Sequence, residues 1–86
     1  MHIHARIHSS SDRHEASVAT DGRAKMLTIP PNPSKPGSGI NGGELLFLAL
    51  ATCYGNDLFR EAAVRGIVVE CVEVEVEVDG QFGGPG

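Results

Sequence analysis

Residues 40–77 read INGGELLFLALATCYGNDLFREAAVRGIVVECVEVEVE, and this stretch decides the fold. The part from Glu44 to Arg65 predicts a helix about 33 Å long, at roughly 1.5 Å per residue. Asn41 and Glu44 have the spacing of a capping box, and Gly66 is typical of a left-handed C-cap. We therefore expect one long helix that begins near Glu44 and ends before Gly66.

The first half of this helix, residues 45–51, is apolar around its whole circumference. A surface helix in water keeps a polar face, so this half is expected to be buried on all sides. At 86 residues the chain is near the lower limit for a single stable core, and one short sheet can cover only one face of the helix. The sequence therefore predicts a partner subunit, most simply in a homodimer, or further sequence.

After the helix, residues 67–79 alternate with a period of two, which predicts a β-strand. The alternation is expected to turn a valine face toward the helix and an acidic face away from it. The valine face would hold Val68, Val72, Val74, Val76 and Val78, with Glu70 as the exception, and the other face Val69, Cys71, Glu73, Glu75, Glu77 and Asp79. Residues 80–86 read as a turn-like tail.

The N-terminal part of the chain predicts a three-stranded antiparallel sheet. Residues 1–8 alternate between apolar and polar, and the Asp21-Gly22 pair is a strong hairpin signal between two further strands. The predicted strands are residues 1–8, 14–20 and 24–29. A connector over residues 30–43 holds four of the five prolines and can be neither helix nor central strand. The expected fold class is therefore α+β: sheet, long central helix, final strand.

Composition narrows the classes of function and partner. The chain is 41% hydrophobic and carries a formal charge of -4 without a basic cluster, which disfavours nucleic acid. It shows neither a cationic leader nor an apolar run long enough for a bilayer, so we expect a cytoplasmic protein without a membrane partner. In a reducing compartment its two cysteines are expected to be thiols.

Taken together, these features resemble the OsmC and organic hydroperoxide resistance (Ohr) family of small thiol peroxidases. The resemblance is carried by the capped turn, the apolar helix with a cysteine after an Ala-rich stretch, the closing Arg-Gly-Ile and the acidic valine strand. It implies an intertwined homodimer with the central helices packed back to back. It also implies reduction of organic hydroperoxides in oxidative-stress defence, with a dithiol reductant and no cofactor.

By family position the attacking thiol would be Cys53. Peroxide reduction needs a thiolate, but Cys53 lies in mid-helix, where the N-terminal dipole no longer favours ionisation. Asp57 has the wrong charge and Arg60 lies two turns away, so a cation must come from elsewhere. Arg13 is the candidate that the resemblance implies, with Arg23 as the alternative. Without such a cation, Cys53 would be an inert, small buried hydrophobe.

The apolar side chains Leu46, Phe47 and Leu50 would favour alkyl hydroperoxides over hydrogen peroxide. Cys71 does not replace the family's second cysteine, because it lies on the acidic face of its strand. We therefore predict no disulfide between Cys53 and Cys71.

The sequence also departs from the family pattern. Family members continue with further strands and a second long helix that carries a second cysteine, so residues 1–86 are interpreted as one OsmC-like domain without that C-terminal half, either a natural short form or a fragment. The family commonly has a glutamate immediately before the position of Glu44, where this chain has Gly43. These departures support an alternative function, a catalytically silent dimerisation or binding module.

His2, His4 and His8 share one face of the first predicted strand, and such an arrangement can bind zinc or copper. No carboxylate or thiol stands at ligand spacing in the same segment. We therefore expect a solvated polar face and no metal site.

Overall fold

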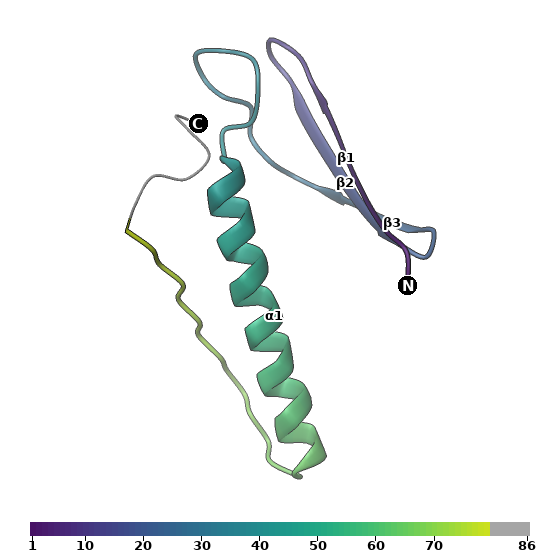
Figure 1. Cartoon of the computed structure of the whole chain (residues 1–86), viewed down its shortest axis with the longest axis vertical. Coiled ribbons are helices and arrows are strands. Elements are labelled where there is room, and N and C mark those ends of the chain that lie inside the picture. The colour runs from purple at the N-terminus through teal and green to yellow at the C-terminus, as the bar shows by residue number, and fades with distance from the viewer. Residues whose placement is uncertain (80–86) are drawn as a thin grey trace. The chain divides into compact units, whose positions relative to one another are not determined.

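A computed structural model describes residues 1–79, and the chain divides into two units, of which the first spans Met1–Asn41 and the second begins at Gly42. The first unit holds a three-stranded antiparallel sheet, and the second holds one long helix followed by residues 67–79 (Figure 1). The predicted α+β class is confirmed. The expected turn-like tail, residues 80–86, lies outside the described residues.

The sheet consists of β1 (Ile3–Ser9), β2 (His14–Thr20) and β3 (Arg23–Leu27), in the order β1-β2-β3. The bounds of β2 agree with the prediction. Strand β3 begins one residue earlier than expected, because the two-residue turn pairs Thr20 directly with Arg23. It also ends earlier, at Leu27, before the proline-rich connector.

The Asp21-Gly22 hairpin turn fixes the register of the sheet. Both residues have positive φ, 49° and 83°, which is the conformation of a type I′ turn. The Asp21 N–H donates to the His2 carbonyl at 2.8 Å, and Asp21 Oδ1 accepts the His2 N–H at 2.8 Å. The turn therefore also holds the start of β1.

Successive residues of each strand alternate between the two faces of the sheet. Ile7 pairs with Ala16, which pairs with Leu27, and this row gives one face its apolar character. Ala16 and Ile29 are the buried apolar residues of the described chain, 6% and 8% exposed. The core of a single chain is therefore small, as its length predicts.

The connector is a folded loop. The Gly39 N–H donates to the Pro30 carbonyl at 2.7 Å, and the Asn32 N–H donates to the Gly37 carbonyl at 2.8 Å. A Cβ at position 39 would lie 2.9 Å from the Pro30 carbonyl oxygen, so this close approach requires glycine.

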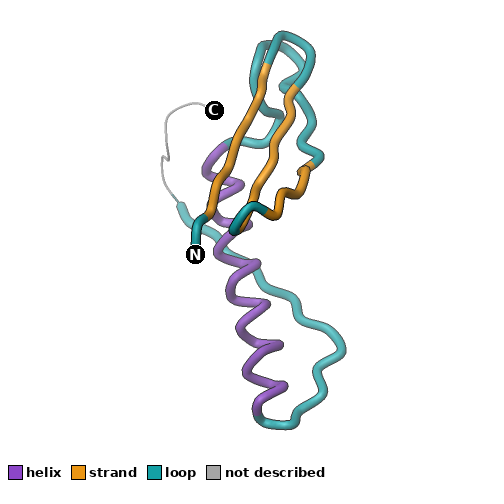
Figure 2. The backbone as a smooth tube through the Cα atoms, turned by 90° about the vertical axis from the view of Figure 1, so that its right-hand side faces the viewer, coloured by secondary structure: helices purple, strands orange, loops and turns teal. Residues whose placement is uncertain are grey.

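The helix α1 spans Gly42–Val64 and starts two residues before the predicted position, directly after Asn41 (Figure 2). It ends in a Schellman motif, in which the Ile67 N–H donates to the Ala62 carbonyl at 2.8 Å and the Gly66 N–H to the Ala63 carbonyl at 3.2 Å. Gly66 has φ of 70°, so the predicted left-handed C-cap is confirmed.

Residues 67–79 run beside α1 (Figures 1 and 2), but the predicted final strand is not confirmed. A strand needs a neighbour with free backbone groups, and the backbone of a helix is already paired. Val72 and Val74 line a hollow of about 240 Å³ against α1, as the predicted valine face requires. Val68 was expected on the same face but is 88% exposed, whereas Val69 is half-buried, so the alternation is interrupted there.

Candidate functional site

Cys53 lies in the middle of α1, and its side chain is exposed with a free thiol. Residues 45–51 are expected to be buried on all sides with the help of a partner subunit or further sequence; in the single described chain α1 has no buried residue, so this burial stays a prediction. Leu46, Leu48 and Leu50 are 45%, 60% and 50% exposed. Among the described residues of the second unit, residues 67–79 lie beside α1, and Val72 and Val74 line a hollow together with it.

The arginines of the second unit are already paired with acids of the helix. Arg60 donates to Asp57 at 2.6 Å, and Arg65 donates to Glu61 at 3.0 Å. Asp57 comes one helical turn after Cys53, so the nearest charge along α1 is negative. Among its described residues, the second unit therefore offers the thiol no unpaired arginine.

Arg13 ends the loop between β1 and β2, and its carbonyl accepts the Ser10 N–H at 2.8 Å. Its Nη1 lies 3.5 Å from Glu15 Oε1, and the two side chains are 71% and 48% exposed. An exposed pair of this kind contributes only about 0–1 kcal/mol, so Arg13 can exchange partners. The alternative, Arg23, begins β3. Both arginines belong to the first unit and Cys53 to the second, so their pairing with the thiol stays a prediction.

The family model described as OsmC-like protein matches residues 35–86, which include the whole of α1 and Cys53. The chain belongs to the OsmC-like protein family. No curated protein and no solved structure matches this OsmC-like chain. The family suggested by the sequence is thus confirmed over α1 and the residues after it, while Arg13 and Arg23 lie before the matched segment.

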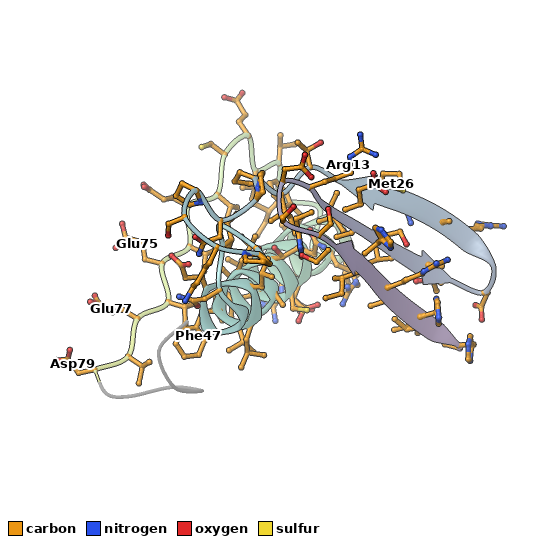
Figure 3. All side chains as sticks on the ribbon, turned by 90° about the horizontal axis from the view of Figure 1, so that it is seen from above. Arg13, Met26, Phe47, Glu75, Glu77 and Asp79 are labelled. Carbon is orange, nitrogen blue, oxygen red and sulfur yellow. The ribbon has the colours of Figure 1, made fainter. Side chains whose placement is uncertain are left out.

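The family's usual glutamate position is occupied by Gly43, the second residue of α1 in this OsmC-like chain, and the acid of the first helical turn is Glu44. Cys71 is free and exposed on residues 67–79. Figure 3 shows Glu75, Glu77 and Asp79 projecting from one side of that segment, as the predicted acidic face requires.

Residues 1–79 contain no group of three or more His, Cys, Asp or Glu side chains that could hold a metal ion. His2, His4 and His8 are all exposed on the first strand and the residue before it. His14 Nδ1 lies 3.0 Å from Ser9 Oγ, across the first hairpin. As to membranes, α1 does not combine the length and hydropathy that a crossing would need, and no other helix is described.

One feature of the first unit was not predicted from the sequence. A hollow of about 410 Å³ opens on the sheet, lined in part by Arg6, Arg13 and Met26. The sequence does indicate which side chains share that face of the sheet, because the alternation of β1 and the Asp21-Gly22 turn together determine it.

Proposed function

We propose that this protein is a thiol peroxidase that reduces organic hydroperoxides through Cys53. The observation that carries the proposal is the exposed free thiol of Cys53 in mid-helix, inside the segment that matches the OsmC-like family. Exposure matters because the attacking sulfur must reach the peroxide oxygen.

The proposed reaction has three steps. The Cys53 thiolate attacks one peroxide oxygen, the O–O bond breaks, and the alkoxide leaves and takes up a proton as the alcohol. The sulfur, now a sulfenic acid, reacts with one thiol of a dithiol to form a mixed disulfide and water. The second thiol of the reductant closes its own disulfide and releases Cys53.

The cation that favours the thiolate is proposed to be Arg13, with Arg23 as the second candidate. Both helix-side arginines are engaged by acids, whereas Arg13 has only a long, exposed contact with Glu15. Exchanging this contact for a thiolate costs little, so Arg13, the candidate that the family resemblance implies, is available to the thiol.

The functional unit is proposed to be a homodimer in which the two α1 helices pack against each other. Three leucines of the first half of α1, Leu46, Leu48 and Leu50, are about half exposed in a single chain, an arrangement that water disfavours. The same assembly would give residues 67–79 a strand to pair with. Apolar walls from Leu46, Phe47 and Leu50 would then favour alkyl hydroperoxides.

A peroxide-consumption assay tests the proposal, with tert-butyl hydroperoxide as substrate and dithiothreitol as reductant. We expect Cys53→Ser to lose essentially all activity and Cys71→Ser, the matched control, to keep the native rate. Equal rates for native protein and Cys53→Ser would contradict the proposal.

A thiol titration at neutral pH separates an inactive enzyme from a silent module. If Cys53 reacts no faster than free cysteine and no peroxide is consumed, the protein is a dimerisation or binding module, which Gly43 in place of the family's glutamate would favour.

A further inference from the structure

The hollow on the sheet lies wholly within the first unit and is formed by all three strands and the first hairpin loop. Its volume of about 410 Å³ is within the range of small-molecule sites. Figure 3 shows Arg13 and Met26 side by side at this place. Its lining residues are Arg6, His8, Arg13, Glu15, Ser17 and Met26, together with Ala16.

The strand register brings the polar strand residues of the hollow and Met26 to one face, whereas Ala16 belongs to the other face. Arg6 pairs with Ser17, which pairs with Met26, so the three form a row across the sheet. His8 pairs with Glu15 in the next row on the same face. The hollow is therefore built on paired strands, a more rigid support than a loop.

The charges of the hollow do not balance. It holds two guanidinium groups and one carboxylate, and that carboxylate, Glu15, lies 3.5 Å from Arg13. Arg6 has neither an ion pair nor a side-chain hydrogen bond with any residue of the described chain. Without His8 in the count, one positive charge is left over, which matches a ligand of charge minus one.

The donors define the chemistry of that ligand. A guanidinium presents parallel N–H groups whose geometry fits a carboxylate. The Ser17 hydroxyl and a His8 ring N–H can supply further donors. Met26, 71% exposed, offers a flexible apolar wall for a short hydrocarbon tail. We propose that this hollow binds a small carboxylate monoanion with a short alkyl chain, anchored by Arg6.

The binding requires no thiol, although Arg13 lines the hollow and is also the cation proposed for Cys53. It is tested with the full, isotope-labelled chain by following backbone amide NMR signals during titration with sodium butyrate at constant ionic strength. We expect saturable shifts at Arg6, Ser17 and Met26, equal shifts in Cys53→Ser, and none with n-butanol, which has a similar tail but no charge.

Two variants with the same charge change sharpen the test. Arg6→Gln should weaken butyrate binding at least about tenfold, since a hydrogen-bonded charge pair is lost. Lys25 lies on the opposite face of the same sheet. Lys25→Gln should therefore change the butyrate affinity less than about twofold, because Lys25 acts on the hollow only through its screened electric field. Arg6→Lys keeps the charge without the planar guanidinium. Its butyrate affinity should lie between those of Arg6→Gln and Lys25→Gln.

The native amide spectrum of each variant establishes that the sheet is folded. Butyrate shifts that do not saturate, that chloride reproduces, or that Arg6→Gln leaves unchanged would overturn the proposal. Tighter binding of inorganic phosphate than of butyrate would also overturn it, because the single excess charge and the Met26 wall would then have no role.

Discussion

At the scale of single residues, Glu15 and Cys53 are proposed to compete for Arg13. The Arg13–Glu15 contact is long and exposed, so its loss hardly affects stability. We expect Glu15→Gln to raise the reactivity of Cys53 toward peroxide a few-fold, because Arg13 is then released. Arg13→Gln should lower that reactivity about tenfold or more, as removal of a charge-assisted contact does.

The rate of Cys53 sulfenylation under a fixed hydroperoxide concentration measures both effects. Arg23→Gln is the matched control and should behave as the native protein. If Arg23→Gln is the slow variant and Arg13→Gln is not, the alternative cation is the correct one and the assignment of Arg13 is wrong.

At the scale of elements, the end of α1 depends on Gly66. Its φ of 70° lies in the left-handed region, where a Cβ costs roughly 1–2 kcal/mol. We expect Gly66→Ala to lower the free energy of unfolding by about 1 kcal/mol, measured by urea denaturation followed by circular dichroism at 222 nm. Gly42→Ala is the control: it is helical, its added Cβ would meet open space, and it should not lower stability. Equal losses in both variants would contradict the role of the C-cap.

The elements also show what the sequence could and could not predict. Strand β2 and the end of α1 are predicted by local signals, the Asp21-Gly22 turn and Gly66, whose geometry is set by a few neighbouring residues. Whether residues 67–79 pair as a strand, and whether Cys53 is buried, depends on groups outside residues 67–79 and α1. The periodicity of these two segments alone therefore could not predict either feature. The change of alternation at Val68 and Val69 comes directly after the Schellman turn, which sets how the chain leaves the helix.

At the scale of the whole molecule, the hollow on the sheet is a proposed site that no short sequence motif predicts. Its residues are spread over positions 6 to 26. They meet because two hairpins place Arg6, Ser17 and Met26 in one row. Predicting such a site requires a correct register together with the charge of each face, and neither of them is sufficient separately.

In the described chain the apolar half of α1, residues 45–51, has large apolar side chains exposed to water, and this exposure leads to a prediction about assembly. Leu48 is 60% exposed in the single chain and lies at the centre of that half. In a back-to-back dimer a charge there would be buried without a partner, which costs several kcal/mol. Leu48→Glu should therefore convert the dimer to a monomer at micromolar concentration, as measured by sedimentation velocity.

Ala63→Glu provides the matched control, because it adds the same charge to an exposed position near the other end of α1. It should leave the dimer intact. A native protein that sediments as a monomer, or a Leu48→Glu variant that dimerises as tightly as Ala63→Glu, would show that the apolar half is covered in another way. The intertwined arrangement would then lose its physical basis, since no other part of the described helix presents so continuous an apolar surface.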